Sequence, residues 1–317
     1  MKKILCLLLG MVLCLLLFGC TEAPEETTVT QQAERVGLCL RQREKNPVYY
    51  DGILAGLQEA GYDVIVQDGS NDQSLQDQQV KSLLDKDCSL LIVEPVMVSA
   101  LDAVVGHAKT ENIPLLILDK EPDPAILESY DRMFFAGCRT FDAGVAQGQL
   151  LEQLPLQGDL NEDGVISYMI LRGPEDHMDA QAITEGCLQS LSAYATEQIG
   201  ITATQWDAAA ARAECAGMMA RYGRDIEVIF CNHALLAQGA AEAVENRGWV
   251  PGQDVYILAV DHNAQLQQLI DTGAVFGTVY AKTERRVAQI LGVVSSIMQE
   301  SLPEKYHYVD CVSVTKP

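Results

Sequence analysis

The chain has 317 residues, of which 48% are hydrophobic and 6% aromatic, and its 22 basic and 44 acidic residues give a formal net charge of -22. This length is enough for two compact domains, and the apolar fraction argues against global disorder. So much negative charge repels phosphate groups, which makes nucleic-acid binding and electrostatic attachment to a membrane surface poor hypotheses.

The N-terminal segment is predicted to be an export signal. Two lysines precede an unbroken apolar run over residues 4–18, which is shorter than the roughly 20 residues of a membrane-spanning helix. The sequence Leu17-Phe18-Gly19-Cys20 resembles a bacterial lipobox. We therefore expect residues 1–19 to be a signal peptide and Cys20 to be lipidated, with an ordinary secretory signal as the alternative.

The segment at 20–34 is predicted to be a flexible tether behind the lipidated Cys20. Its composition is acidic and lacks basic residues, and such a segment cannot bury enough apolar area to fold. The sequence thus predicts an extracytoplasmic domain anchored to the cell membrane only through a lipid.

Seven cysteines follow Cys20 in the chain. An odd number cannot all pair, and no Cys-x-x-Cys spacing occurs. Most of them lie in apolar runs, where a thiol behaves as a small hydrophobic group. Buried free thiols are therefore the prediction, and structural disulfides or a zinc site are weak hypotheses.

Short apolar runs alternate with amphipathic segments along the rest of the chain. The predicted strands are Arg35–Leu40, Tyr62–Gln67, Ser89–Val93, Pro114–Leu118, Met133–Ala136, Val165–Leu171, Glu227–Cys231, Val255–Val260 and Ala274–Tyr280. The clearest predicted helices are Tyr50–Ala60, Gln73–Lys86, Phe141–Leu154, Ala208–Tyr222 and Ala234–Arg247. This alternation predicts an α/β fold, and the number of units favours two doubly wound parallel-sheet lobes with a break near 137–139.

Polar residues follow several of the predicted strands. They are Asp119, His177, Asp179, Asn232, His233 and Asp261. Ligands of doubly wound sheets bind beyond the carboxyl ends of the strands. Each residue alone could be a helix N-cap, but together they suggest a hydrogen-bonding cleft between the lobes.

A loop at 159–167 resembles the first part of an EF-hand calcium loop. Asp159, Asn161 and Asp163 stand at alternating positions, followed by a turn glycine, the Val165 carbonyl and Ser167. Such oxygens suit a hard cation. The bidentate Glu expected at the twelfth position is missing, so either a remote carboxylate completes the shell or the loop is an Asx-rich turn.

Several separated stretches resemble the periplasmic galactose/glucose-binding proteins of sugar ABC transporters, which have the type I periplasmic binding protein fold. The matching stretches are 70–74, 120–122, 129–132, 159–164, 177–180, 206–207 and 226–229. They cover nearly all of the chain after the tether. The resemblance implies two lobes joined by a three-strand hinge, a sugar in the cleft between them, and no covalent chemistry.

The resemblance implies a first lobe at 35–137 plus 282–304 and a second lobe at 138–281 plus 305–317. It also supplies Glu227 as the remote carboxylate of a structural calcium (Ca2+) site, together with Asp159, Asn161, Asp163, Val165 and Ser167. We expect the chain to be a monomer.

For the ligand, the resemblance implies that Trp206 stacks on a sugar ring, with Tyr49 or Tyr50 near the opposing aromatic position. The residues expected to bind the ligand are Tyr49, Tyr50, Asp119, His177, Asp179, Trp206, His233 and Asp261. The alternatives are core packing for Trp206 and helix capping for His233. Three positions depart from the family, which has Arg at Ile183 and Asn at His233 and Ala281, so galactose or glucose specificity does not carry over directly.

The expected function is delivery of a galactose-like or glucose-like monosaccharide to an ABC importer. One alternative is a lipid-anchored sensor that presents a non-hexose ligand to a membrane receptor kinase. Another is an enzyme that uses Cys231 as nucleophile and His233 as base, which no surrounding motif supports. A cytoplasmic repressor of the same fold conflicts with the export signal.

Overall fold

The structure is a computed structural model that describes residues 33–301 and 303–316. The predicted signal peptide and Cys20 lie outside these residues, as does nearly all of the predicted tether. Residues Glu34–Pro317 form one compact unit. No helix within the described ranges is long and apolar enough to cross a membrane.

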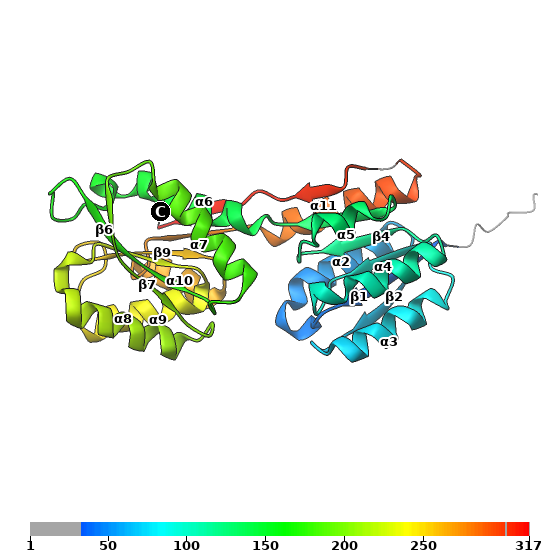
Figure 1. Cartoon of the computed structure of the whole chain (residues 1–317), viewed down its shortest axis with the longest axis horizontal. Coiled ribbons are helices and arrows are strands. Elements are labelled where there is room, and N and C mark those ends of the chain that lie inside the picture. Colours follow the sequence, from blue (N-terminus) through cyan, green and yellow to red (C-terminus); the bar gives the residue numbers. More distant parts are fainter. Residues whose placement is uncertain (1–32, 302, 317) are drawn as a thin grey trace, which may run out of the picture. The chain divides into compact units, whose positions relative to one another are not determined.

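Two six-stranded sheets organise this unit (Figure 1). The first sheet has the order β11-β5-β4-β3-β1-β2 and the second has the order β12-β10-β9-β8-β6-β7. All neighbouring strands pair in parallel except β10 and β12, which are antiparallel. The predicted α/β class with two parallel-sheet lobes is confirmed.

The strands of the first sheet are β1 (Arg35–Leu40), β2 (Asp63–Asp68), β3 (Leu90–Val93), β4 (Leu115–Leu118), β5 (Met133–Gly137) and β11 (Tyr306–Tyr308). Its helices are α2 (Pro47–Glu59), α3 (Gln73–Leu84), α4 (Leu101–Thr110), α5 (Pro124–Glu128) and α11 (Thr283–Met298), with short 3-10 turns η1 (Arg43–Lys45) and η2 (Val98–Ala100). One hydrophobic cluster joins α2 and α11 to the sheet, and another joins α3, α4 and α5 to it. Strands β3 and β4 are apolar throughout because helices cover both faces.

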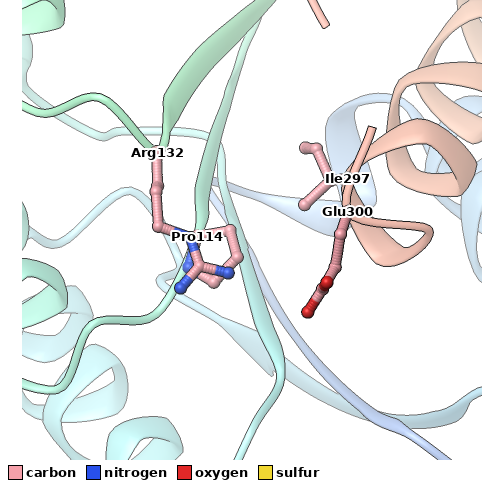
Figure 2. Close-up of a pocket in the computed structure, with 4 residues that line it drawn as sticks. All are labelled: Pro114, Arg132, Ile297 and Glu300. Atoms are coloured by element: carbon pink, nitrogen blue, oxygen red, sulfur yellow. The ribbon is translucent and has the colours of Figure 1, made fainter. Parts of the chain in front are cut away.

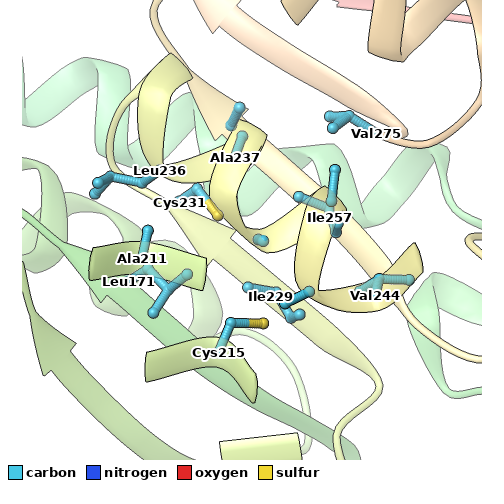
Figure 3. Packing of buried hydrophobic residues seen from close by; sticks show 14 of the residues in the cluster. Leu171, Ala211, Cys215, Ile229, Cys231, Leu236, Ala237, Val244, Ile257 and Val275 are labelled. Carbon is cyan, nitrogen blue, oxygen red and sulfur yellow. The ribbon is translucent and has the colours of Figure 1, made fainter. Parts of the chain in front are cut away.

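The strands of the second sheet are β6 (Ile166–Arg172), β7 (Thr196–Ala203), β8 (Val228–Cys231), β9 (Tyr256–Val260), β10 (Gly277–Tyr280) and β12 (Val312–Thr315). Its helices are α6 (Thr140–Gln149), α7 (Met178–Leu191), α8 (Ala208–Tyr222), α9 (Ala234–Asn246) and α10 (Ala264–Thr272), with 3-10 turns η3 (Leu150–Gln153), η4 (Pro155–Gly158) and η5 (Gly223–Asp225). One cluster packs α8, α9 and α10 on the sheet, and Figure 3 shows Cys215 and Cys231 inside it among aliphatic side chains. The other cluster contains α6 and α7.

The chain passes between the two sheets three times. It crosses between β5 and α6, between β10 and α11, and between β11 and β12. The third crossing corrects one expectation, since residues 305–317 do not all join the second lobe. Strand β11 pairs with β5, and the ring of Phe135 packs against Tyr306 and Tyr308, so only β12 belongs to the second sheet.

Strand β7 was not predicted from the sequence. It is one of the two edge strands of the second sheet, pairs with β6 alone among the described strands and is mostly half-exposed. Its sequence mixes Glu, Gln, Gly and Thr with isoleucine. An edge strand with both faces partly solvated needs no strong apolar pattern, so the usual sequence signal is weak here.

Candidate ligand-binding site

Five of the predicted ligand residues follow strands of the second sheet. Trp206 follows β7, His233 follows β8 and Asp261 follows β9, while His177 and Asp179 come after β6 at the start of α7. Because the carboxyl ends of parallel strands meet at one edge, the fold brings these residues to the same side of the lobe.

Trp206 lies at the centre of this group. The His177 ring is 5.4 Å from the indole at an interplanar angle of 88°, and the His233 ring is also 5.4 Å away, tilted by 57°. The indole packs against Gly173, where an added Cβ would lie under 3.0 Å from the ring. Trp206 also has a positive φ of 55°. Such backbone strain is costly for a bulky residue and is concentrated at functional positions.

His233 contacts Asp261 and caps a helix at the same time. Its Nδ1 accepts a hydrogen bond of 3.1 Å from the Leu235 backbone N–H, so the prediction that it could cap α9 is confirmed. Its Nε2 lies 3.1 Å from Asp261 Oδ2. Since Nδ1 accepts, the ring N–H on Nε2 is directed at the carboxylate.

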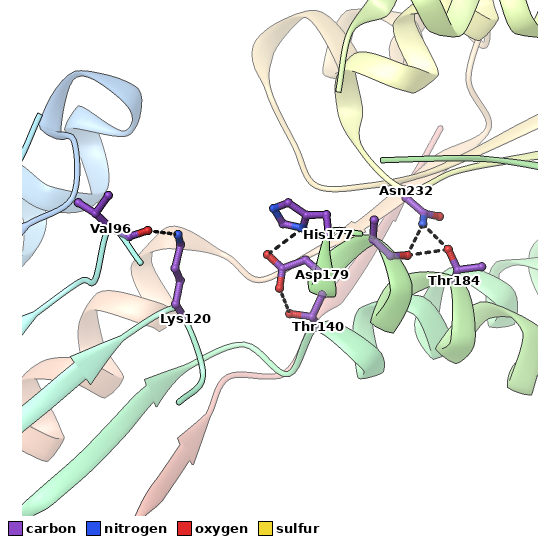
Figure 4. A network of polar contacts seen from close by, with 8 residues as sticks. Val96, Lys120, Thr140, His177, Asp179, Thr184 and Asn232 are labelled. Atoms are coloured by element: carbon purple, nitrogen blue, oxygen red, sulfur yellow. Dashed lines mark hydrogen bonds and ion pairs between the residues drawn. The ribbon is translucent and has the colours of Figure 1, made fainter. Parts of the chain in front are cut away.

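Asp261 and Asp179 are the two acidic groups of this edge that the sequence predicted to bind the ligand. Asp261 has a positive φ of 74°, and Asp179 Oδ1 accepts a 3.5 Å hydrogen bond from the Thr140 hydroxyl. Asp179 Oδ2 is 4.0 Å from His177 Nδ1, and Figure 4 shows it between His177 and Thr140. Neither aspartate makes an ion pair with a lysine or arginine of the described residues.

The first sheet places Asp119 and Tyr49 in a buried cluster rather than at a free surface. Arg286 of α11 lies 2.5 Å from Asp119 Oδ1, and its guanidinium lies 4.0 Å from the centre of the Tyr49 ring. Tyr49 is only 1% exposed. Burial, together with Asp119, raises the pKa of Tyr49. Tyr49 thus has no ring face available for a ligand in this structure.

Three residues at the edge of the first sheet were not among the predicted ligand residues. Arg41, Glu94 and Lys120 follow β1, β3 and β4. The Tyr50 hydroxyl donates to Glu94, and burial raises the pKa of this carboxyl. Burial and the nearby Arg41 lower the pKa of Lys120, whose Nζ donates to the Val96 carbonyl at 2.8 Å (Figure 4). Their position after a strand is the signal that could have found them.

Two positions that depart from the resembling family differ in environment. Ile183 is buried in the cluster between α6, α7 and the second sheet. Ala281 is half-buried just after β10. Neither side chain can make a hydrogen bond, so this edge lacks donors at both places.

The Cys231 thiol is completely buried, and burial raises its pKa well above the ordinary value. A nucleophilic cysteine needs an accessible thiolate. The structure therefore gives no support to Cys231 and His233 as a catalytic pair.

The calcium-like loop is closed by hydrogen bonds to Glu227. This glutamate is 1% exposed, and its carboxylate accepts from the backbone N–H groups of Leu160, Asn161 and Ser167 at 2.6, 3.0 and 2.8 Å. The family resemblance thus identified a real contact between this glutamate, next to β8, and the loop.

The loop side chains also accept backbone hydrogen bonds. Asp159 accepts from Asp163 and Gly164, Asn161 accepts from Asp163, and Asp163 accepts from Val165. Within the described residues, no three His, Cys, Asp or Glu side chains are close enough together to hold a metal ion. The oxygen-only donor set fits calcium chemically, but its carboxylates do not converge on one point here.

Two hollows of the surface lie away from the strand ends. One of about 270 Å³ is lined by Pro114, Arg132, Ile297 and Glu300, at the amino-terminal edge of the first sheet (Figure 2). A larger one of about 840 Å³ lies around Trp249 between α9 and α10. Neither contains a predicted ligand residue.

Comparison with known proteins agrees with this fold. A model of the periplasmic binding protein domain matches residues 45–299. This chain belongs to the periplasmic binding protein family, and membership implies an extracytoplasmic location.

Named relatives are sugar-binding proteins. The chain is 33% identical over 225 residues to the D-galactose/methyl-galactoside binding periplasmic protein MglB of Haemophilus influenzae, covering 69% of this chain and 67% of that protein. It is 20% identical over 272 residues to the multiple sugar-binding periplasmic receptor ChvE of Rhizobium radiobacter, covering 80% and 74%.

Solved structures share the fold. A periplasmic ribose ABC transporter protein from Conexibacter woesei matches with a TM-score of 0.78 and 14% identity, covering 89% of this chain and 92% of that one. An ABC transporter periplasmic solute binding protein from Actinobacillus succinogenes, with bound D-allose, matches with a TM-score of 0.74 and 19% identity, covering 89% and 98%.

Proposed function

We propose that this protein captures a monosaccharide between its two lobes and delivers it to an ABC importer, without catalysing a reaction. The observation that carries the proposal is the Trp206 ring, held in a strained conformation at the strand ends and surrounded by His177, His233, Asp179 and Asp261. An aromatic face suits the C–H face of a sugar, and the carboxylates accept from its hydroxyls.

The two tryptophans of the chain allow a direct test of this site. Trp249 lies in the turn before β9, away from the strand ends. In a Trp249→Phe variant, Trp206 is the sole tryptophan. We expect the fluorescence of this variant to change when a monosaccharide that the protein binds is added. A Trp206→Phe variant should give no such response, and a response retained there would place the sugar elsewhere.

Thermal unfolding identifies the sugar. The chain from Thr21 to Pro317 retains the whole compact unit. A ligand at 100 times its Kd should stabilise it by about 2.7 kcal/mol. If no monosaccharide in a broad panel raises the Tm, the sugar-binding proposal is wrong even though the fold stands.

We also propose a structural calcium ion held by Asp159, Asn161, Asp163, Val165, Ser167 and Glu227. In its support, Glu227 is buried without a basic partner among the described residues, and every candidate donor is an oxygen. Binding requires the loop oxygens to exchange some of their backbone hydrogen bonds for the ion.

Calcium at 100 times its Kd is expected to raise the Tm by roughly 5 to 10 °C, and a chelator should reverse the effect. Glu227→Gln should abolish the response. The matched control is Glu162→Gln, which changes an exposed glutamate of the same loop that is not a proposed ligand. An unchanged Tm in calcium for the unaltered chain would show that the loop is an Asx-rich turn.

We also propose that a lipid on Cys20 attaches the protein to the membrane. We further propose that the protein is a monomer. The lipobox-like sequence supports the first. Mass spectrometry of the mature N-terminus tests the lipid, since an ordinary secretory signal would leave it unmodified.

A further inference from the structure

The carboxyl edge of the second sheet is rich in hydrogen-bond acceptors. The side chains of Asp179 and Asp261 are 56% and 51% exposed. Both carboxylates therefore have lone pairs that solvent or a ligand can reach. Among the described residues, neither forms an ion pair with a lysine or arginine, although Lys120 of the first sheet lies near enough to Asp179 for the two charges to interact.

The two histidines contact the carboxylates differently. His233 accepts at Nδ1 from Leu235 and directs its Nε2 at Asp261 Oδ2, 3.1 Å away. His177 Nδ1 is 4.0 Å from Asp179 Oδ2, too far for a hydrogen bond.

Donors are few on the same edge. Ile183 is buried in the core and Ala281 has no polar side-chain atom. Arg172, at the end of β6, directs one guanidinium nitrogen to the Glu175 carbonyl at 2.8 Å, and its Nε is buried without a partner among the described residues. The half-exposed carboxylates of Asp179 and Asp261 can accept hydrogen bonds from a ligand group that donates them, while Arg172 still offers a donor at this edge.

Trp206 adds an attraction for positive charge. Its indole lies among the residues that carry these carboxylates, next to both histidine rings. The face of an indole ring attracts a cation, and nearby carboxylates strengthen the attraction. The edge of the first sheet is different, because Arg41 and Lys120 lie there.

We propose that the sugar carries an ammonium group, and that Asp179, Asp261 and Trp206 bind this group. The ligand class is an amino sugar of hexose size. This inference rests on the proposed function, because it assigns the chemistry of a substituent on a sugar bound at the same edge.

Calorimetric titration at about pH 7, where an amine is largely charged, compares three forms of each sugar. They are D-galactosamine and D-glucosamine, the parent hexoses, and the N-acetyl derivatives. We expect the amino sugars to bind about tenfold more tightly than the parent hexoses, the size of one charged hydrogen bond. The N-acetyl forms should lose the gain, and added salt should reduce it.

Asp261→Asn and Asp179→Asn should each remove most of the preference for the amino sugar while leaving affinity for the parent hexose less affected. Asparagine tolerates the positive φ at position 261, so the backbone can be retained. The control is Asp271→Asn, an exposed aspartate of α10 in the same lobe, which should keep the preference.

Equal or tighter binding of a parent hexose would overturn the amino-sugar inference and leave the proposed function intact. Preference that persists in both aspartate variants would also overturn it. If the amino sugars, the parent hexoses and the N-acetyl derivatives all fail to bind while a different monosaccharide raises the Tm, the amino-sugar inference is wrong and the proposed function stands. Absence of binding by every monosaccharide would contradict both.

Discussion

Replacing Gly186 by alanine is expected to destabilise the protein by about 3 kcal/mol, measured by urea unfolding. An added Cβ at Gly186 would lie under 3.0 Å from the Phe141 carbonyl oxygen, and one at Gly144 would meet the Ile183 carbonyl in the same way. Helices α6 and α7 thus touch backbone to backbone. Because backbone atoms cannot rotate away as a side chain does, such overpacking falls at the severe end of its usual range.

Gly217 in α8 is the matched control. It is also a helical glycine, but apart from its chain neighbours and the backbone of its own helix, no atom of the described residues lies within 4 Å of the place that an added Cβ would take. Gly217→Ala should stabilise the protein by about 0.5 to 1 kcal/mol, because alanine loses less entropy in a helix. If Gly186→Ala behaves like Gly217→Ala, the two helices are not in backbone contact.

Replacing Arg286 by methionine is expected to cost about 3 to 5 kcal/mol in the free energy of unfolding. The change removes the ion-pair partner of Asp119 and the cation above the Tyr49 ring. An uncompensated carboxylate would then remain in a largely buried place, where desolvation is expensive.

The neighbouring Arg285 provides the control, because it is exposed on the same helix. Arg285→Met should change stability by no more than about 0.5 kcal/mol. The double variant Arg286→Met with Asp119→Asn should recover part of the loss, since both charges are then gone and asparagine accepts the positive φ of Asp119. Equal costs at 285 and 286 would show that the pair contributes little.

The order of most strands and helices was predictable because most elements have a local signal, with β7 as the exception. Apolar runs such as Leu115–Leu118 are buried on both faces, and Gly273, in the left-handed conformation, ends α10. The C-terminal pairing was not predictable in this way. Residues 306–308 and 312–315 join different sheets, which depends on long-range contacts with β5 and β10.

The candidate site shows the same division. The position of His233 and Asp261 after predicted strands indicated that they would share one edge, whereas Trp206 was assigned through the family resemblance. The structure places the three together. The sequence could not show whether Tyr49 or Tyr50 faces a ligand, because both lie in the first turn of α2 and their burial depends on the packing of that helix. Tyr49 faces the core of the first lobe, and Tyr50 donates to Glu94, a residue that sequence reasoning passed over.

Local patterns along the chain were enough to predict the α/β class, the family and the strand-end placement of most polar residues, because these follow from periodicity and from the spacing of short motifs. The charge state of the site depends instead on the folded arrangement. Folding pairs Asp119 with Arg286, which is distant in the chain, and leaves Asp179 and Asp261 without a basic partner among the described residues. Pairing of charges depends on distance in space, which separation in sequence does not reveal.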